Sequence, residues 1–350
     1  MSSPSQEPAA LDRDAFGDLA IAVVIPCLNE EVSIRTVIED FRAALPSASI
    51  YVYDNNSTDR TGAVAREAGA IVRREPEPGK GSVVRRMFSD IDADVYVLVD
   101  GDATYPADEA PAMIGRLIDD HLDMVSGARE PQHQGAYRPG HRFGNRFITV
   151  LVGLTFGRRF SDILTGYRVL SRRFVKSFPA LSKGFEIETE ITVHALEMRL
   201  PSAEVPIPYY ERPEGSSSKL HTVRHGISIL KTILILIKEE RPLEFFSILC
   251  AVFELAAVIL AWPVVMEYLE TGLVPRFPTA ILSTGLALLG FMWLACGLIL
   301  DTVTHSRQEI KRLNYLALPG LPQRTAGTAR GAIEGRARDA GAGAGPGPRR

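Results

Sequence analysis

The sequence predicts an α/β domain with a mainly parallel, mixed sheet, followed by two helices that cross a membrane as a hairpin. Three observations support this fold class. Short apolar runs alternate with amphipathic stretches from Leu19 onwards, two long apolar segments lie near the C-terminus, and 46% of the 350 residues are hydrophobic while 23% are charged. Such a composition can bury a large core and excludes a broadly disordered chain.

The predicted sheet is built from four apolar runs that helical stretches separate. The strand candidates are residues 19–26, 50–54, 70–74 and 94–100, and the helix candidates between them are residues 31–45, 58–69 and 81–91. Nearly continuous Val and Ile runs are typical of a buried parallel sheet with helices on both faces. Ligands of such sheets bind beyond the carboxyl ends of the strands. Polar residues follow three of these ends, at 29–30, 54–57 and 100–102, so we expect a site there.

Acidic pairs of the type Asp-x-Asp occur four times, as Asp12/Asp14, Asp90/Asp92, Asp92/Asp94 and Asp100/Asp102. Only the last pair directly follows an apolar strand, VYVLV, and Gly101 between the two carboxylates permits close backbone approach. Mg²⁺ and Mn²⁺ suit such a site, because hard cations bind one or two carboxylates plus substrate phosphates. We therefore predict a divalent-metal site at Asp100/Asp102. A solvated turn is the simpler interpretation of the other three pairs.

Residues 245–266 and 278–300 are the two apolar segments, and Glu254 is their only charged residue. Each exceeds the roughly 20 residues that a helix needs to cross a bilayer. A pair of buried core helices is the alternative, but such helices normally carry a polar stripe. Basic residues are concentrated before and after the hairpin rather than in its connecting loop. This asymmetry predicts a multi-pass protein of the cytoplasmic membrane, with the α/β domain and the C-terminus in the cytoplasm.

The flanking segments differ in character. Residues 1–18 lack the basic start and apolar run of a secretory signal and are expected to be disordered, as is most of the Gly/Ala/Arg-rich tail at 304–350. Residues 219–242 predict an amphipathic helix, since Arg224, Lys231 and Lys238 recur every seven residues. A helix lying on an anionic leaflet is favoured, and a plain packing helix is the alternative. The Arg-flanked apolar run at 147–157 either lies in the membrane interface or forms a core helix.

Eight sequence blocks lie in order between residues 21 and 220. They are VVIPCLNEE, VYDNNSTDRT, GKG, VLVDGDATYP, SGAR, DILTGYRVLSRR, GFEIETE and VPIPYYERPEGSSSKL. Together they resemble glycosyltransferase family 2 and, within it, the polyprenyl-phosphate glycosyltransferases related to dolichol-phosphate mannose synthase. The resemblance implies a Rossmann-like GT-A fold over residues 19–218. It also implies inverting transfer of a sugar from a UDP- or GDP-linked donor to an undecaprenyl-type polyprenyl phosphate, for use in cell-envelope glycans or glycolipids.

The same resemblance implies roles for individual residues. Asp102 would be the principal metal ligand, and Asp100 would contact the nucleotide or sugar and serve as a second candidate ligand. The family usually has two acidic residues where this chain has Asp54 and Asn55, which weakens any inference about the base. The implied nucleotide-sugar site comprises Pro26, Leu28, Glu30, Tyr53, Asp54, Asn55, Lys80, Asp100, Gly101, Asp102 and Arg129.

Charge gives a separate argument about the acceptor. A sugar hydroxyl needs a general base, whereas a phosphate oxygen is already anionic and needs mainly cations that screen its repulsion from the donor. Asp162 could orient the acceptor, or act as the base if the acceptor were a hydroxyl. The candidate acceptor-phosphate residues are Arg138, Arg142, Arg168, Arg212, Ser218 and Lys219. The predicted catalytic set is Asp100, Asp102, Asp162, Arg212 and Lys219.

Two other functions stay open: transfer to a hydroxyl of a polysaccharide or lipid, and a non-catalytic membrane protein that binds a nucleotide sugar. A processive polysaccharide synthase would need a Gln-x-x-Arg-Trp motif, but Trp262 and Trp293 lie inside the apolar segments. The net charge of −3 gives no general attraction to nucleic acid. Expected partners are the nucleotide sugar, polyprenyl phosphate and membrane lipids. A separate flippase or a homo-oligomer is a further hypothesis, because two helices are few for a flipping path.

Overall fold

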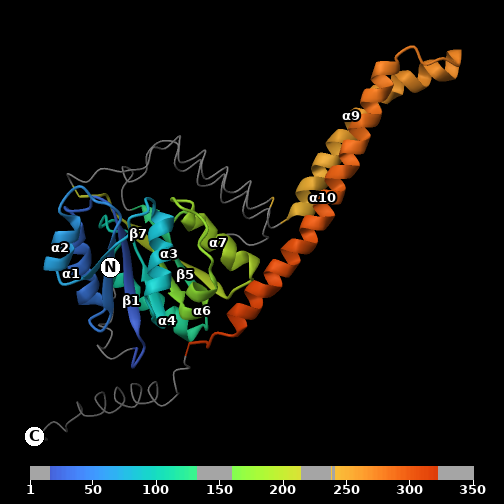
Figure 1. Cartoon of the computed structure of the whole chain (residues 1–350). Coiled ribbons are helices and arrows are strands. Elements are labelled where there is room, and N and C mark those ends of the chain that lie inside the picture. Colours follow the sequence, from blue (N-terminus) through green and yellow to red (C-terminus); the bar gives the residue numbers. More distant parts are fainter. Residues whose placement is uncertain (1–15, 132–159, 214–237, 239–240, 322–350) are drawn as a thin grey trace, which may run out of the picture.

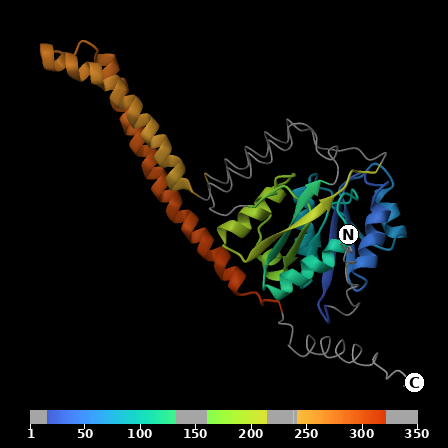
Figure 2. The same cartoon turned by 180° about the vertical axis from the view of Figure 1, so that it is seen from behind.

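The computed structural model describes residues 16–131, 160–213, 238 and 241–321. They form an α/β domain and a long helical hairpin that projects from it (Figure 1). Figure 2 shows from behind that helices cover both faces of the sheet. The predicted fold class is therefore confirmed. Phe16 packs against the core, so the segment 1–18, which was expected to be disordered, is ordered at its C-terminal end.

A seven-stranded sheet with the order β3-β2-β1-β4-β6-β5-β7 forms the centre of the domain. The strands are β1 (Ile21–Cys27), β2 (Ser49–Asp54), β3 (Ile71–Arg74), β4 (Val95–Leu98), β5 (Met124–Pro131), β6 (Arg168–Ser171) and β7 (Ser202–Tyr209). Only β6 runs antiparallel to its neighbours, β4 and β5, among these strands. The sheet is therefore mixed and mainly parallel. β7 lies at the edge of the sheet and, within the described chain, pairs with β5 alone. Pro206 and Pro208, which lack a backbone N–H, are tolerated there because no described strand pairs with the other side of β7.

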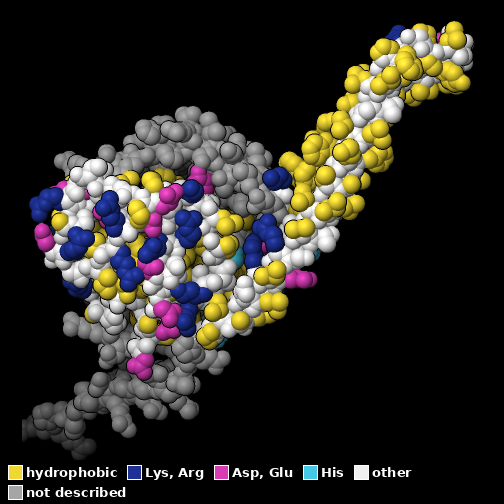
Figure 3. All heavy atoms as spheres, viewed as in Figure 1, with side chains coloured by type: hydrophobic (Ala, Val, Ile, Leu, Met, Phe, Trp, Pro, Cys, Tyr) yellow, Lys and Arg dark blue, Asp and Glu magenta, His cyan; other side chains and the backbone are white. Residues whose placement is uncertain are grey.

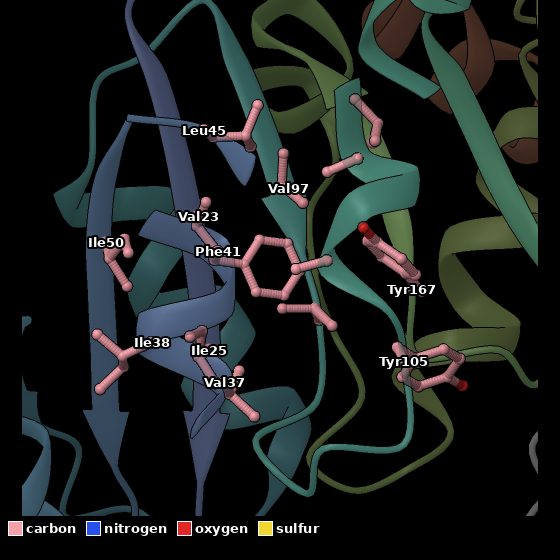
Figure 4. Packing of buried hydrophobic residues seen from close by; sticks show 14 of the residues in the cluster. Val23, Ile25, Val37, Ile38, Phe41, Leu45, Ile50, Val97, Tyr105 and Tyr167 are labelled. Atoms are coloured by element: carbon pink, nitrogen blue, oxygen red, sulfur yellow. The ribbon is translucent and has the colours of Figure 1, made fainter. Parts of the chain in front are cut away.

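Helices bury a hydrophobic core on each face of the sheet. One face carries α1 (Ile34–Ala44), α2 (Thr61–Glu67), the short 3-10 helix η1 (Ala107–Glu109) and α4 (Ala110–Asp119), and the other carries α3 (Lys80–Asp90), α6 (Arg172–Ser177) and α7 (Ile187–Glu197). Successive strand residues point to opposite faces, so Val23 joins the first core and Val24 the second. In Figure 4, Phe41 of α1 lies between Val23 and Tyr167, whose ring meets it edge-on at 6.0 Å.

The carboxyl ends of β1, β2 and β4 meet at one edge of the sheet. The strand register places Cys27 beside Asp54, and the amide of Asn55 donates to the carbonyl of Cys27 at 2.8 Å. The Ser33 hydroxyl donates to the carbonyl of Gly101 at 2.7 Å and so ties the loop after β1 to the loop after β4. The predicted convergence of three polar strand ends is confirmed.

The hairpin consists of α9 (Pro242–Thr271) and α10 (Phe277–Leu316). With 30 and 40 residues, these helices are about 45 and 60 Å long. Their most apolar windows are only 6% and 11% buried, and Figure 3 shows a largely hydrophobic surface along the hairpin. A core helix of a soluble protein would be mostly buried, so both helices are candidate membrane spans by length, composition and exposure.

The second helix continues beyond the predicted span into the first part of the segment 304–350. Residues 304–316 form the last turns of α10. Lys311 Nζ contacts both carboxylate oxygens of Glu197, at 2.9 and 2.8 Å, and the Tyr315 hydroxyl donates to Asp123 at 2.7 Å. These tertiary contacts stabilise the last turns of α10, and the composition of this segment alone does not predict the contacts. Residues 219–237 of the predicted amphipathic helix, the run at 147–157 and the tail after 321 lie outside the described residues.

We expect Tyr315→Phe to lower the stability of this junction. The Tyr315 hydroxyl shares the buried Asp123 carboxylate with Arg173 and Ser171, and a hydrogen bond to a charged group contributes about 1.5–3 kcal/mol. Thermal unfolding in detergent should therefore show a lower midpoint for the variant. Tyr268→Phe, on an exposed part of α9, is the control that should match the wild type. Equal midpoints for all three proteins would contradict this role of Tyr315.

Candidate active site

The acidic pair lies in the loop directly after β4. Asp102 is 3% exposed, and its Oδ1 accepts a hydrogen bond from the Thr104 hydroxyl at 2.6 Å. Its Oδ2 lies 2.6 Å from Nη2 of Arg212. Burial raises the pKa of Asp102, the nearby charge of Asp100 raises it further, and Arg212 opposes both. A carboxylate placed in this way is ionised most readily when positive charge is close to it.

Lys80 joins Asp100 to a third carboxylate. Lys80 is the first residue of α3, and its Nζ lies 2.5 Å from Asp100 Oδ1 and 2.6 Å from Glu188 Oε1 on α7. Burial alone would lower the pKa of Lys80, but the two carboxylates raise it above its usual value. Burial also raises the pKa of Glu188, an effect that Lys80 opposes. Sequence reasoning assigned Glu188 no role; the shared GFEIETE block was the available signal.

Three hydrogen bonds of Asn55 hold the loop that leads to Lys80. The side-chain oxygen of Asn55 accepts from the amide of Gly79 at 2.7 Å, while its nitrogen donates to the carbonyls of Glu75 and Glu77 at 2.9 and 2.8 Å. A carboxylate could not make the two donor contacts. The loop that leads into α3 therefore explains why this chain has Asn55 where the family usually has an acidic residue.

A glycine makes room for Asp100. A Cβ atom added at Gly166 would overlap the Asp100 carboxylate, and the Gly166 amide donates to the Tyr105 hydroxyl at 2.9 Å. The loop before β6 therefore packs directly against the acidic pair, and a side chain at this position would displace the Asp100 carboxylate.

We expect Gly166→Ala to lower kcat/KM for sugar transfer by about tenfold or more, because it displaces Asp100, and small misplacements of reacting groups are costly. Steady-state kinetics on the folded protein measure the effect. Gly115→Ala is the matched control, since a Cβ there meets no atom within 4 Å. Equal kcat/KM values for the two variants would remove the steric argument.

The loop after β1 contributes Glu30, which is 9% exposed. Its carboxylate lies 4.0 Å from Arg212, and its amide donates to the Thr61 hydroxyl at 2.8 Å. Leu28 is 37% exposed at the same edge, and Pro26 is half-buried. The structure therefore brings Glu30, Leu28 and Pro26 to the strand ends that also carry Asp54 and Asp102.

Two predicted site residues, Tyr53 and Arg168, have side chains inside the domain. Tyr53 is fully buried under α3, where its hydroxyl bonds to Asp90 at 3.2 Å and burial raises its pKa to about 12. Arg168 is also fully buried, and its Nη2 donates to the carbonyls of Ile163 and Glu188 at 2.9 and 3.0 Å. Both side chains make their hydrogen bonds inside the domain. Tyr53 belongs to the core, and Arg168 joins the loop before β6 to α7.

Arg129 and Asp162 bind each other. Arg129 Nε and Nη2 lie 2.6 and 2.8 Å from the two Asp162 oxygens, beside a cavity of about 460 Å³. A carboxylate held in such a bidentate pair is a weak proton acceptor, because the guanidinium stabilises its ionised form. The geometry therefore disfavours Asp162 as a general base. The remaining predicted acceptor residues, Arg138, Arg142, Ser218 and Lys219, lie outside the described residues.

The donor atoms of the acidic pair fit a divalent cation. No group of three or more His, Cys, Asp or Glu residues suited to a metal occurs within residues 16–131, 160–213, 238 and 241–321. Mg²⁺ and Mn²⁺ do not need such a group, because substrate phosphates and water complete their coordination shell. Asp102, which is buried, offers one carboxylate for such an ion, and Asp100 beside it offers the second.

Comparison with known proteins decides the family. The glycosyl transferase family 2 model matches residues 22–178. Glycosyltransferase AglJ from Haloferax volcanii is 31% identical over 299 residues, which cover 85% of this chain and 98% of that protein. The chain belongs to glycosyltransferase family 2. A second relative from Haloferax volcanii, a dolichyl-phosphate hexose transferase, is 32% identical over 227 residues, which cover 65% of this chain and 96% of that protein.

A solved structure supports the GT-A-like fold of this family 2 glycosyltransferase. Glucosyl-3-phosphoglycerate synthase from Mycobacterium tuberculosis, in complex with Mn²⁺, UDP-glucose and phosphoglyceric acid, superposes with a TM-score of 0.52. The two proteins are 23% identical, and the match covers 66% of this chain and 85% of that one. The likeness shows a shared fold.

Proposed function

We propose that the protein transfers a hexose from a nucleoside-diphosphate sugar to a polyprenyl phosphate at the cytoplasmic face of a membrane. One observation carries this proposal: the Asp100/Asp102 pair, contacted by Lys80 and Arg212, lies in a domain that is joined to an apolar hairpin. The name of the dolichyl-phosphate hexose transferase among the relatives supports a lipid-phosphate acceptor. The UDP-glucose of the solved neighbour supports a hexose donor.

In the proposed reaction, a phosphate oxygen of the lipid attacks the anomeric carbon, and the bond from that carbon to the donor diphosphate breaks. Inversion at the anomeric carbon follows from a single displacement. Mg²⁺ or Mn²⁺, held by Asp102 and Asp100, would stabilise the charge on the departing diphosphate. Arg212 supplies a cation between Asp102 and Glu30, where it can screen the repulsion between the two phosphate-bearing substrates.

The pairing of Asp162 with Arg129 favours a phosphate acceptor over a hydroxyl acceptor. A hydroxyl needs a base to remove its proton, and the carboxylate suggested for that task is already bound to a guanidinium. A phosphate monoester needs no such base. The pairing therefore supports the phosphate acceptor, and no contact described above supports the hydroxyl acceptor.

A transfer assay tests the proposed function. Membranes that contain the protein are incubated with labelled UDP- and GDP-linked hexoses, with and without undecaprenyl phosphate and with and without EDTA. We expect one donor to give an acid-labile lipid product that needs the added lipid phosphate and is lost with the chelator. Absence of lipid product with every donor, while the sugar enters polymer or soluble product, would contradict the proposed acceptor.

A further inference from the structure

A cavity of about 410 Å³ lies where the catalytic domain meets the base of the hairpin. It is lined by Leu196, Glu197, Met198 and Arg199 at the end of α7, by Arg241 just before α9, and by His305, Gln308, Glu309 and Arg312 of α10. Figure 3 shows basic side chains gathered at this junction. The proposed transfer reaction uses none of these residues.

The cavity is separate from the active site. Glu188, which contacts Lys80, lies one residue from the start of α7, whereas the cavity lies at the other end of this 11-residue helix. The length of α7 separates the two places by about 16 Å. A lipid phosphate bound in the cavity could therefore not be the acceptor that reacts at Asp100/Asp102.

The cavity lies at the level of phospholipid headgroups if the hairpin spans a bilayer. Arg241 directly precedes α9, and His305 lies five residues after Leu300, where the apolar segment of α10 ends. Five helical residues rise about 7.5 Å, and each polar layer of a bilayer is about 5–8 Å thick. Arg241 and His305 therefore place the membrane-facing side of the cavity within reach of the headgroup layer, while Arg312, about 18 Å beyond Leu300 along α10, lines the far side of the cavity.

Within the described residues, two of the cavity's arginines take part in no ion pair, although the Glu309 carboxylate also lines the cavity. Glu197 binds Lys311 and Arg241 pairs with Glu244 at 2.7 Å, whereas Arg199 and Arg312 form no ion pair within the described part of the chain. Arg199 also has a left-handed backbone, with φ of 52°, at a helix end where glycine is the favoured residue. Exposed guanidinium groups in a hollow at the membrane surface suit a phosphodiester, because an arginine can donate two parallel hydrogen bonds to phosphate oxygens.

We propose that this cavity binds the headgroup of an anionic phospholipid through Arg199 and Arg312. Basic pockets between helices at the cytoplasmic surface bind anionic headgroups by this chemistry. The bound lipid links the end of α7 to α10 and holds the catalytic domain at a fixed height above the bilayer. This inference rests on the membrane placement of the hairpin proposed above, but not on the identity of the sugar acceptor.

The double variant Arg199→Gly/Arg312→Gln tests the site. Glycine suits the backbone of residue 199, so the change removes the cation without straining the helix end. His121→Gly/Arg116→Gln is the matched control, since His121 has the same left-handed φ of 52° at the end of α4 and Arg116 is an exposed arginine on that helix. The purified full chain in neutral detergent is titrated with short-chain phosphatidylglycerol or phosphatidylcholine, and bound lipid is counted by native mass spectrometry.

We expect the wild type and the control variant to bind phosphatidylglycerol in preference to phosphatidylcholine. The Arg199/Arg312 variant should bind phosphatidylglycerol at least about tenfold more weakly than the wild type. Equal binding by all three proteins, or no preference for the anionic lipid, would overturn the site. Displacement of the lipid by equimolar inorganic phosphate would show a free-phosphate site instead. Flotation with vesicles is measured in parallel: a wild type that does not float would overturn the membrane placement as well, whereas a floating protein without lipid selectivity overturns the site alone.

Discussion

Asp102→Asn should lower sugar transfer by about 10²–10³-fold or more while leaving the fold and the membrane association unchanged. Asparagine keeps the size of the side chain and can still accept from Thr104, but it removes the charge that Arg212 contacts. The cation that Asp102 would hold stabilises the departing diphosphate, and loss of one such electrostatic contact typically lowers the rate by about 10²–10³-fold. Initial rates with saturating donor and acceptor measure the loss, and circular dichroism checks the fold.

Asp92→Asn is the matched control for this experiment. Asp92 belongs to two of the other three Asp-x-Asp pairs, and its ion pair with Arg172 is exposed. We expect wild-type transfer rates for it, because an exposed ion pair contributes little to stability or function. If both variants keep normal rates, the position of Asp102 after β4 does not mark a metal or phosphate site.

Lys80→Met should abolish transfer and destabilise the domain at neutral pH. Lys80 is the cation between Asp100 and Glu188, and removal of one partner from a buried pair costs about 3–5 kcal/mol because the other charge stays buried. Denaturant unfolding measures the stability and product formation the activity. Lys183→Met is the control, because the ion pair of Lys183 with Glu77 is exposed. A Lys80→Met protein as stable and active as this control would contradict the buried network.

The pH dependence of the Lys80 variant has a defined sign. Burial raises the pKa of Glu188, and loss of the Lys80 charge removes an interaction that lowers it. The folded variant then binds a proton that the unfolded chain releases above its usual glutamate pKa, so the stability of the variant falls as the pH rises from about 4.5. The deficit relative to the wild type should be smaller at pH 5 than at pH 8. A deficit that is constant over this range would show that Glu188 is not the group left unpaired.

The strand ends and the acidic pair could be predicted because they depend on local patterns. Asp100 and Asp102 stand directly after a continuous apolar strand, and parallel strands bring their carboxyl ends to one edge. The hairpin could be predicted for a similar reason, since a membrane selects for length and apolar composition within a single segment. Neither inference required knowledge of which distant residues touch.

The contacts of Lys80, Arg168 and Tyr315 could not be predicted, because each depends on residues far away in the chain. Lys80 and Glu188 are 108 positions apart, and nothing local to either one selects the other. Arg168 occurs in a basic block typical of phosphate binding, yet it begins β6, a strand buried along its whole length. Tyr315 follows a charged stretch at the end of α10. This stretch is tied to the domain by the contact of Tyr315 with Asp123 and by the contact of Lys311 with Glu197.

A comparison of two matched acceptors tests the central claim most directly. The purified protein is given the donor identified in the membrane assay, together with either a polyprenyl phosphate or the polyprenol of the same chain length. We expect a glycosyl phosphate product with the phosphate and none with the alcohol, because Arg212 and the acidic pair would serve two phosphate groups and Asp162 is held by Arg129. Transfer to the polyprenol at a comparable rate would contradict the proposed acceptor.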